Sequence, residues 1–527
     1  MGGRRQVAFA QVDHTPVPLF LIPHFGGDGV EVEAHRYPFA GQANVTLRLG
    51  VVAADGGPVR WLAAGDLTDR YLARVHWTPD GLLLLQVQSR DQTRLEVRRV
   101  NPTTGETRTL WVEDCRPWIN PTDDLTFVQV EGAADADYTI LWSSERTGRR
   151  ELYLYDRDGA PLHQITRARV LIDGVRGVDA AGGWVYYDGW RETPLERHLF
   201  RSPWPAARLS RSRHEAGAHL CVLAKDCSAY VDVYDSVTAP PTATIRAIGG
   251  AWSARLQPAA VDARVGALAL RPPDFITVTT RDGVTLHGAV YRPPAVAPGS
   301  KAPVVVSVYG GPHAQRVANT WALTADLRAQ YYAQQGFVVV RIDNRGSARR
   351  GLAFEGAIHR NMGAIEVQDQ ADGVRALADL IPEADLDRVG VYGWSYGGYM
   401  ALMCLARAPE LFKAGIAGAP VTHWDGYDTH YTERYMGTPA DNPEGYRISS
   451  VMAHVEAVRG RLLLVHGMID ENVHFRHTGR LLTALIRARV PYELQLFPAE
   501  RHTPRREEDR VFMEQRMAAF LQQCLRQ

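Results

Sequence analysis

A serine at residue 395 lies in a pattern that could make it a nucleophile. It occupies the centre of Gly393-Trp394-Ser395-Tyr396-Gly397, after the apolar run Val389-Gly390-Val391-Tyr392 and before a helix-compatible stretch that begins at Tyr399. A strand, a tight turn and a helix in this order force the serine into a strained conformation and lift its hydroxyl clear of the sheet. The flanking glycines allow the close approach of backbones that such a turn requires.

A serine hydroxyl is a weak nucleophile unless a base lies beside it. In hydrolases built on this turn, an orienting acid and then a histidine follow the serine along the chain. Asp470 lies one short loop beyond an apolar strand, and His502 follows the last apolar strand of the chain. The sequence therefore predicts Ser395 as nucleophile, Asp470 as orienting acid and His502 as general base. His466 is an alternative base, but its place before a tight turn favours a structural role.

Attack on a carbonyl group creates an oxyanion, which needs hydrogen-bond donors that are already in position. One predicted donor is the backbone N–H of Tyr396, directly after the nucleophile. The second should come from the loop after an early strand, Val308-Tyr309-Gly310-Gly311-Pro312. This loop offers the phenol of Tyr309 as well as its backbone groups; burial as an ordinary aromatic residue is the alternative for Tyr309.

The segment after the strand predicted at 414–419 is rich in aromatic residues. Trp424, Tyr427, Tyr431 and Tyr435 fall within about a dozen positions. Together they could line a flat apolar pocket that suits a ring as small as that of proline. Ordinary packing beneath a loop is the alternative interpretation.

The N-terminal half of the chain consists of short alternating runs typical of β-strands, separated by turn signals. Segments 93–97, 150–154 and 196–200 look like one strand that recurs, and their starts lie 150 − 93 = 57 and 196 − 150 = 46 residues apart. A propeller blade needs about 40–50 residues for its four strands. Residues 1–268 are therefore predicted to form a partial β-propeller of about five or six blades, with a β-sandwich as the alternative.

From residue 269 onward, apolar strands alternate with amphipathic helices. This alternation predicts a mostly parallel, doubly wound sheet covered on both faces, an α/β-hydrolase domain over residues 269–527. Active sites of such sheets lie at the carboxyl ends of the strands, where Ser395 is placed. The predicted strands are 304–308, 337–342, 389–392, 414–419, 462–465 and 494–497, and the clearest helices are 365–380 and 478–487.

The amino-acid composition argues against several classes of partner and cofactor. The 527 residues are 45% hydrophobic and 22% charged, with 59 basic and 59 acidic residues, so neither a nucleic-acid partner nor a membrane surface is indicated. The five cysteines are odd in number and form no C-x-x-C pair, which argues against a zinc site or disulfide framework, although a Cys221–Cys227 bridge stays open. No metal or other cofactor is expected.

Targeting signals are not evident in the sequence. No apolar run reaches the ~20 residues of a membrane helix. The start, Met1-Gly2-Gly3-Arg4-Arg5, is not followed by the apolar core of a signal peptide. The chain as it stands is therefore expected in the cytoplasm.

Several motifs together resemble the prolyl oligopeptidase family. They are Gly-Trp-Ser-Tyr-Gly-Gly-Tyr at 393–399, Tyr-Gly-Gly-Pro at 309–312, Asp-Asn-Arg-Gly-Ser at 343–347 and His-Gly-x-x-Asp-x-Asn-Val-His at 466–474. The aromatic segment 421–437 is similar to the dipeptidyl peptidase IV subfamily, and Arg-Tyr-Pro-Phe-Ala-Gly at 36–41 is similar to a propeller segment of that subfamily. The resemblance covers nearly the whole chain.

The resemblance implies a function for each of these residues. Ser395, Asp470 and His502 would form a catalytic triad, with Tyr309 and the Tyr396 amide as oxyanion donors. Asn472 would hold the carbonyl of the substrate's second residue. The implied activity is hydrolysis of peptide bonds through an acyl-enzyme, with release of N-terminal dipeptides that carry proline or alanine in the penultimate position. The implied pocket for that residue is lined by Tyr396, Val421, Trp424, Tyr427, Tyr431 and Val473.

Relatives of this kind are often dimers through the hydrolase domain, and bacterial ones are often periplasmic or secreted. The subfamily also clamps the ammonium group of its substrate with two adjacent glutamates, which precede the segment that residues 5–9 resemble. Here the only adjacent pair is Glu507-Glu508, and Glu31 and Glu33 fall in the wrong part of the motif. We therefore expect either a fragment of a longer protein or a partner that completes it. A broader acyl-peptide hydrolase or esterase and an inactive protein stay open.

Overall fold

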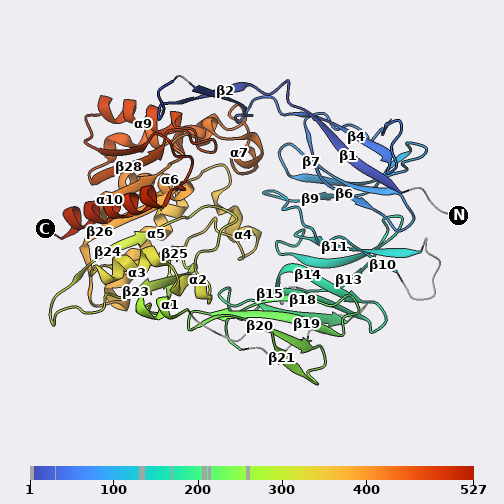
Figure 1. Cartoon of the computed structure of the whole chain (residues 1–527), viewed down its shortest axis with the longest axis horizontal. Helices are drawn as coiled ribbons and strands as arrows, with labels where there is room; N and C mark the ends of the chain where they lie inside the picture. The colour runs from blue at the N-terminus through green and yellow to red at the C-terminus, as the bar shows by residue number, and fades with distance from the viewer. Residues whose placement is uncertain are drawn as a thin grey trace.

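Five successive antiparallel sheets build the N-terminal half of the chain, and a mixed eight-stranded sheet builds the C-terminal half. The two halves face each other across the molecule (Figure 1). The computed structural model describes residues 5–29, 31–129, 137–167, 170–203, 210–211, 215–256 and 262–526. Residues 1–4, part of the start inspected for a signal peptide, lie outside this range.

Each of the N-terminal sheets is a chain of strands that pair in sequence order, as in propeller blades. Neighbouring sheets share apolar cores: Leu84 and Val97 pack with Ile140 and Trp142 between the second and third sheets. The first sheet contains β1 (Gln6–Asp13), β4 (Thr46–Ala53) and β5 (Arg60–Trp61); the second β6 (Arg70–Trp77), β7 (Leu83–Ser89), β8 (Arg94–Val100) and β9 (Thr107–Asp114); the third β10 (Thr126–Gln129), β11 (Tyr138–Ser144), β12 (Glu151–Asp156) and β13 (Pro161–Gln164); the fourth β14 (Leu171–Asp179), β15 (Trp184–Trp190), β16 (His198–Pro203) and β17 (Ser210–Arg211); the fifth β18 (Ala218–Leu223), β19 (Ala229–Ser236), β20 (Ala239–Ala247) and β21 (Ser253–Arg255).

The recurring segment in the sequence corresponds to one position in three consecutive sheets. Strands β8, β12 and β16 are each the third strand of their sheet. A repeat of this kind, with a separate four-stranded sheet for each copy, is the arrangement of propeller blades and not of a two-sheet sandwich. The prediction of a partial propeller with about five or six blades is confirmed, with five sheets in the described part of the chain.

A two-stranded arm, β2 (Leu19–His24) and β3 (Glu31–Arg36), leaves the first sheet and reaches the other domain (Figure 1). On this arm the ring of Phe20 lies 3.9 Å from the ring of His474. The carboxylate of Glu33 accepts a hydrogen bond from Arg501 at 2.9 Å. The arm therefore joins the propeller to the loops of the C-terminal sheet.

The C-terminal sheet has the strand order β22-β23-β25-β24-β26-β27-β28-β29. The strands from β24 onward pair in parallel, whereas β22 and β23 are antiparallel. The predicted α/β-hydrolase architecture is confirmed. The strands are β22 (Asp274–Thr279), β23 (Thr285–Tyr291), β24 (Ala302–Ser307), β25 (Val338–Asp343), β26 (Ala384–Trp394), β27 (Phe412–Gly418), β28 (Arg461–Gly467) and β29 (Glu493–Phe497).

Helices cover both faces of this sheet because its central strands are apolar on both sides. Alternate residues of β24 enter two separate cores: Val304 and Val306 face one, and Val305 faces the other. Helices α3 and α10 supply the second core, and α5, α6 and α9 the first. The helices are α1 (Ala263–Ala267), α2 (Trp321–Thr324), α3 (Leu327–Gln334), α4 (Leu352–Glu355), α5 (Ile365–Leu380), α6 (Tyr396–Arg407), α7 (Thr429–Met436), α8 (Pro443–Ile448), α9 (Arg476–Arg487) and α10 (Glu507–Leu525), with short 3₁₀ turns at Gly356–Ile358, Trp424–Gly426, Val451–Ala453 and Val455–Ala457.

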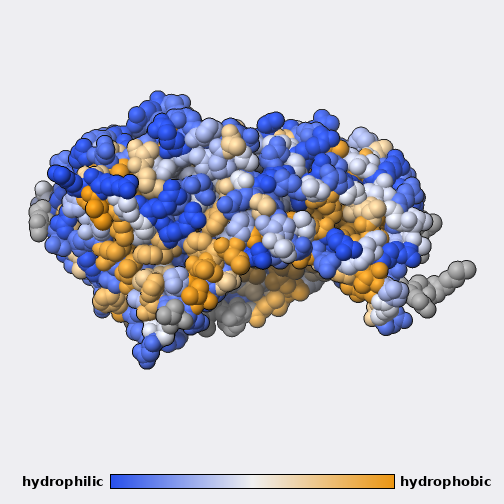
Figure 2. Space-filling model, turned by 90° about the horizontal axis from the view of Figure 1, so that it is seen from above, coloured by the Kyte–Doolittle hydropathy of each residue, from blue (hydrophilic) through white to orange (hydrophobic). Residues whose placement is uncertain are grey.

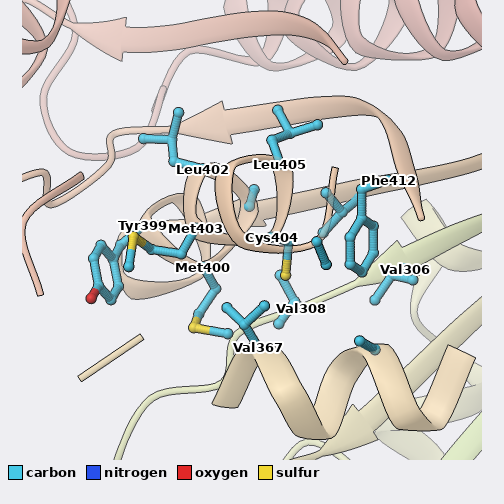
Figure 3. Packing of buried hydrophobic residues seen from close by; sticks show 14 of the residues in the cluster. Val306, Val308, Val367, Tyr399, Met400, Leu402, Met403, Cys404, Leu405 and Phe412 are labelled. Carbon is cyan, nitrogen blue, oxygen red and sulfur yellow. The ribbon is translucent and has the colours of Figure 1, made fainter. Parts of the chain in front are cut away.

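Helix α6, which follows Ser395, is apolar all round and fully enclosed. Figure 3 shows its residues Tyr399 to Leu405 packed between Val306 and Val308 of the sheet region, Phe412 of β27 and Val367 of α5. A helix with apolar side chains on every side is stable only in the core of a large domain. The elbow at Ser395 is therefore held between a central strand and a helix that packing prevents from moving.

Further predictions concern the cysteines, the surface and the domain boundary. Cys221 and Cys227 are both unpaired, so no bridge joins them. Within the described ranges, no helix has the length and apolar character needed to cross a membrane. Figure 2 shows hydrophilic and hydrophobic residues interspersed over the face seen from above, with several hydrophobic patches. The boundary predicted between residues 268 and 269 stays a prediction; α1 lies directly before it.

Candidate active site

Ser395 sits at the carboxyl end of β26, between that strand and α6. Its backbone has φ 60° and ψ −116°, a strained conformation for a residue other than glycine. A Cβ atom on Gly393 would lie 2.1 Å from the carbonyl oxygen of Gly397, and one on Gly397 would lie 2.4 Å from that of Val308. Only glycine fits at both positions, so the local sequence forces the elbow that exposes the serine hydroxyl.

Asp470 and His502 come together beyond the ends of β28 and β29. The Nδ1 atom of His502 lies 2.7 Å from Oδ2 of Asp470. This contact leaves Nε2 as the ring atom that can take a proton from a nucleophile. The backbone carbonyl of His502 accepts a hydrogen bond from the indole of Trp394, the residue before Ser395, at 2.8 Å. The loop of His502 is thus tied to the elbow.

The carboxylate of Asp470 is completely buried and has four hydrogen-bond donors. Its Oδ1 accepts from the backbone N–H groups of Asn472 and Val473, both at 2.9 Å. Its Oδ2 faces His502 and also Nε2 of His466 at 3.1 Å. Burial would raise the pKa of Asp470, but the hydrogen bonds from the two histidines outweigh it and hold that pKa well below its usual value. His466, considered as an alternative base, thus contacts the acid and lies at the end of β28.

Tyr309 lies on the loop after β24, half-buried next to Tyr396, with 6.0 Å between the two ring centroids. Within the described part of the chain its hydroxyl makes no hydrogen bond, so this donor is free for a ligand. Burial raises the pKa of the Tyr309 phenol, which keeps it protonated. The loop is fixed from behind: Asn344 donates to the carbonyl of Gly310 at 2.9 Å.

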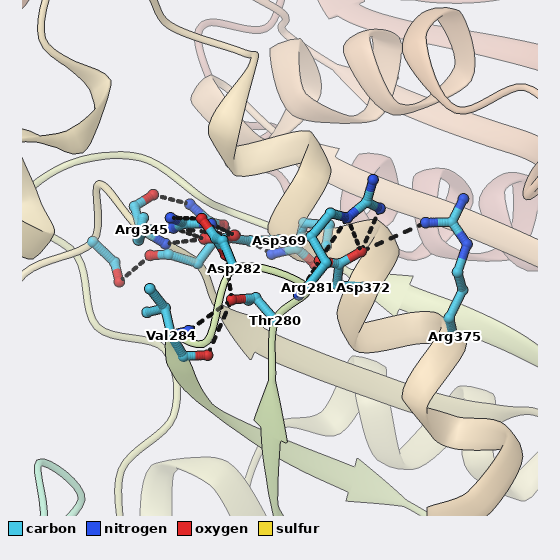
Figure 4. A network of polar contacts seen from close by, with 11 residues as sticks. Thr280, Arg281, Asp282, Val284, Arg345, Asp369, Asp372 and Arg375 are labelled. Atoms are coloured by element: carbon cyan, nitrogen blue, oxygen red, sulfur yellow. Dashed lines mark hydrogen bonds and ion pairs between the residues drawn. The ribbon is translucent and has the colours of Figure 1, made fainter.

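The segment Asp343-Asn344-Arg345 anchors this loop to the rest of the domain. Asp343 accepts from the backbone N–H groups of Arg316 and Val317, at 2.8 and 2.9 Å. Burial raises the pKa of Asp343 to about 6, against those two hydrogen bonds. Arg345 is itself clamped between Asp369 of α5 and Asp282 of the β22–β23 turn (Figure 4). The motif therefore links the Tyr309 loop to helix α5.

The predicted pocket residues form a cluster of aromatic rings beside the elbow. The ring of Trp424 lies 5.5 Å from that of Tyr396, and it is stacked on Tyr431 at 6.3 Å and 21°. Tyr427 meets Tyr431 edge-on at 5.3 Å. Trp424 lies on the short 3₁₀ turn Trp424–Gly426, Tyr427 on the extended link that follows it and Tyr431 on helix α7, and their rings contact one another.

The remaining predicted pocket residues lie on neighbouring loops. Val421 and Val473 are buried. The side-chain oxygen of Asn472 accepts a hydrogen bond from the Tyr427 hydroxyl at 2.7 Å, which leaves its amide group as a donor. Its backbone carbonyl accepts from Tyr37 of the propeller at 3.2 Å. Asn472 therefore joins the acid loop, the aromatic cluster and the propeller.

Helix α7 is held by side chains of the propeller, which the sequence did not reveal. The guanidinium of Arg90 binds the buried Glu433 carboxylate at 2.6 and 2.7 Å, and Gly41 N–H donates to the same group at 2.7 Å. Arg434 donates to Gln92 at 2.5 Å and contacts Asn120 and His313. Partners such as Arg90 and Glu433, 343 residues apart, carry no local sequence signal.

A polar cavity of about 220 Å³ lies beside this interface. Its walls combine Glu145 and Asp173 of the propeller with His313, Glu355 and Arg434 of the other domain. Burial raises the pKa of Glu145. Carboxylate and guanidinium groups of both domains therefore meet in these walls.

Glu31 and Glu33, the two acids of the first strands that were compared with the ammonium clamp, interact with residues of the arm and of the loop at Arg501. Glu33 binds His35 and Arg501, and its carboxylate pKa falls to about 2 because of those contacts, the His35 hydrogen bond first. Glu31 lies on the same strand and is exposed. In the ranges that the structure describes, no group of three or more His, Cys, Asp or Glu side chains is placed to hold a metal ion.

Comparisons with known proteins assign the chain to a family. The prolyl oligopeptidase family matches residues 323–527, and the dipeptidyl peptidase IV N-terminal region matches residues 3–241. Dipeptidyl peptidase 8 of Mus musculus is 34% identical over 606 aligned positions, and that of Homo sapiens 33% over 597; each alignment covers 99% of this chain and 66% of the relative. The chain thus spans slightly less than two thirds of the length of these relatives.

Solved structures agree with this assignment. The crystal structure of Porphyromonas gingivalis dipeptidyl peptidase 4 superposes with a TM-score of 0.90 at 28% identity, over 99% of this chain and 73% of that one. The match includes both the propeller sheets and the hydrolase sheet, since it extends over nearly the whole chain. The chain belongs to the prolyl oligopeptidase family, in its dipeptidyl peptidase IV subfamily.

Proposed function

We propose that this chain is a serine peptidase that releases dipeptides from the free N-termini of peptides. The observation that carries the proposal is the contact between His502 and Asp470 at 2.7 Å, tied through Trp394 to the strained elbow at Ser395. Acyl transfer requires three parts: a nucleophile on an elbow, a histidine oriented by a buried carboxylate, and free oxyanion donors. Family membership supports the same reaction.

In the proposed mechanism, the Oγ atom of Ser395 attacks the carbonyl carbon of the scissile peptide bond while its proton passes to Nε2 of His502. The oxyanion accepts hydrogen bonds from the Tyr396 N–H and the Tyr309 hydroxyl. The peptide C–N bond then breaks as His502 returns the proton to the leaving amine. Water, deprotonated by His502, hydrolyses the resulting ester and releases the dipeptide. Asp470 holds the histidine in the required tautomer throughout.

Penultimate proline or alanine is the proposed preference. The rings of Trp424, Tyr431 and Tyr396 contact one another beside Ser395, and we propose that they form the wall of an apolar site. Such a site favours a small, flat, apolar ring and gains little from a long or charged side chain. Asn472 is proposed to bind the carbonyl of the substrate's second residue through its amide, and Val421 and Val473 to close the pocket.

A broader acyl-peptide hydrolase or esterase is the second candidate. The observation in its favour is the place of the only Glu-Glu pair of the sequence: Glu507 and Glu508 begin α10, where they complement the helix dipole. They do not supply an ammonium clamp beside the pocket. An enzyme without such a clamp would accept N-blocked peptides and simple esters as readily as free N-termini.

One comparison of substrates tests these proposals. Gly-Pro-anilide, its N-acetylated form and p-nitrophenyl acetate are offered to the purified chain and to Ser395→Ala, with a fluorophosphonate probe to titrate the nucleophile. A strong preference for the free N-terminus supports the dipeptidyl peptidase, and equal rates on the blocked peptide favour the second candidate. If wild type is neither labelled nor active, the chain is inactive as a peptidase.

A homodimer through the hydrolase domain is also proposed. Leu327 of α3 and Val511 of α10 are 57% and 49% exposed, and both line a surface groove between these two helices. Exposed apolar residues gathered in one place mark interaction surfaces. Light scattering after size exclusion should give twice the chain mass, and Val511→Glu should give the mass of one chain. A wild-type monomer at micromolar concentration would contradict the proposal.

A further inference from the structure

Glu366 is a buried carboxylate directly behind the candidate pocket. It lies in the first turn of α5, and its side chain is inaccessible to solvent. One oxygen, Oε1, accepts a hydrogen bond from the Tyr396 hydroxyl at 2.8 Å and another from the Gly363 N–H at 2.9 Å. The other oxygen, Oε2, has no hydrogen-bond partner among the described residues.

Burial of the Glu366 carboxyl group costs free energy that its hydrogen bonds offset only in part. Within the described residues it forms no ion pair; the nearby Arg407 donates instead to the carbonyl of Gly363 at 3.4 Å. Burial raises the pKa of Glu366 to about 6, against the hydrogen bonds that it accepts. An uncompensated polar group in a core costs free energy, and an apolar side chain would pack there without that cost. Such departures from good packing concentrate at functional sites.

The partner of Glu366 is the residue that joins the nucleophile to the pocket. Tyr396 follows Ser395, and its backbone N–H is the proposed oxyanion donor. Its ring contacts Trp424 at 5.5 Å and Tyr309 at 6.0 Å. The backbone of Tyr396 is fixed by α6, but the tilt of its ring depends on what holds the hydroxyl at the far end, and that group is Glu366.

We propose that Glu366 is a positioning residue for substrate specificity: through the Tyr396 hydroxyl it fixes the ring that forms one wall of the pocket for the penultimate residue. This role rests on the proposed function of the site. Without the tether the Tyr396 ring can rotate toward the site, and the wall that it presents to the penultimate residue changes shape. Reaction of Ser395 with compounds that leave the pocket empty does not depend on this wall.

Tyr399, one turn further along α6, provides a matched control. It is also a buried tyrosine, and its hydroxyl donates to the backbone carbonyls of Met362 and Ser449, both at 2.9 Å. Replacing either tyrosine by phenylalanine removes a buried hydroxyl group from the same helix and keeps the ring. Tyr399→Phe therefore has a comparable structural effect but leaves the Glu366–Tyr396 contact intact.

The test uses Glu366→Ala, Glu366→Gln, Tyr396→Phe and the control Tyr399→Phe in the full chain. For each variant, kcat/KM is measured for Gly-Pro-anilide and for p-nitrophenyl acetate, together with the inhibition of ester hydrolysis by prolyl pyrrolidide. Loss of one buried hydrogen bond predicts a drop of about 10- to 100-fold in kcat/KM for the proline substrate in Glu366→Ala. In Glu366→Ala, ester hydrolysis and fluorophosphonate labelling should stay within about threefold of wild type, because neither reaction fills the pocket and a threefold change in rate corresponds to much less free energy than a lost hydrogen bond.

Two further results separate positioning from support of the fold. The amide oxygen of Glu366→Gln can still accept from Tyr396, so this variant should recover most of the activity. The effects of Glu366→Ala and Tyr396→Phe should not add in the double variant, because both remove the same contact. Weaker inhibition by prolyl pyrrolidide should follow the same pattern.

The proposal is overturned if Glu366→Ala and Tyr399→Phe lower both activities equally, or if the losses in the double variant multiply. Failure of the proposed function would look different: wild type would then hydrolyse the ester but would not prefer the free N-terminus of Gly-Pro-anilide. In that case the inhibition by prolyl pyrrolidide still decides the role of Glu366. If wild type does not bind this compound, no proline pocket exists and the role of Glu366 is refuted as well.

Discussion

Replacement of Asp470 by asparagine is the most direct perturbation of the proposed triad, because the structure fixes how the amide must lie. The Oδ1 atom of Asp470 accepts from two backbone N–H groups, those of Asn472 and Val473, at 2.9 Å. An asparagine keeps these bonds only if its oxygen stays there, which turns its NH₂ toward His502 and His466. The flipped amide would leave two buried donors unpaired, at about 1–3 kcal/mol each.

The amide therefore donates to Nδ1 of His502, and the ring must carry its proton on Nε2. That tautomer cannot take the proton of Ser395, so the loss should resemble the removal of the orienting acid in other triads. We expect kcat to fall by about 10⁴-fold, equivalent to about 5.4 kcal/mol in the barrier. The assay is steady-state hydrolysis of Gly-Pro-anilide together with the rate of fluorophosphonate labelling, which reports the nucleophile alone.

Glu471, the next residue, supplies the control. Its carboxylate is 32% exposed and pairs with Arg501 at 3.3 Å, so Glu471→Gln should change kcat by no more than about twofold. Unfolding curves of both variants show whether the fold is retained. If Asp470→Asn keeps kcat within tenfold of wild type with an intact fold, the assignment of Asp470 as the orienting acid is wrong.

Two other perturbations follow from the contacts around the site. Arg90→Ala removes the guanidinium from the Glu433 carboxylate, which is 1% exposed and keeps a hydrogen bond from the Gly41 N–H. The free energy of unfolding, measured with urea, should fall by up to about 3 kcal/mol. Arg447→Ala, at the exposed pair with Glu444, should lower it by less than about 0.5 kcal/mol. Equal effects of the two would refute a buried interdomain pair. Asn344→Asp replaces the donor to Gly310 with a second acceptor and should lower kcat about tenfold with little change in KM; a change in KM alone would contradict the role of Asn344.

The parts of the fold that the sequence predicted well are those with local signals. The helix expected at 365–380 is α5, Ile365–Leu380, because its apolar residues repeat with the helical period. The strand expected from residue 389 begins earlier, at Ala384. The sequence did not indicate this earlier start because Asp385 and Asp387 interrupt the apolar pattern. Strands β22 and β23 have no separate prediction because neither has the continuous apolar run of the central strands: β22 alternates in burial, and β23 carries Thr285 and His287 in its first half.

The residues of the candidate site also differ in whether a local sequence signal predicts them. The order of Ser395, Asp470 and His502 could be derived from the order of the strands, because the carboxyl ends of parallel strands meet at one edge. The contact of Glu366 with Tyr396 could not, because an acidic residue in the first turn of a helix ordinarily indicates a favourable charge at the helix dipole. Its burial follows from the packing of α5 on α6, which appears only in the assembled domain.

The propeller contributes to the pocket through helix α7. The rings of Tyr431 and Tyr435 lie on this helix, while Glu433 and Arg434 point to Arg90 and Gln92 of the other domain. The helix alternates between residues that form the site and residues that bind the propeller, so a shift of one domain must move the aromatic wall. A change at this interface should therefore alter the recognition of the penultimate residue before it alters the chemistry at Ser395, since the side chains of Asp470 and His502 are held by hydrogen bonds with residues of the hydrolase domain.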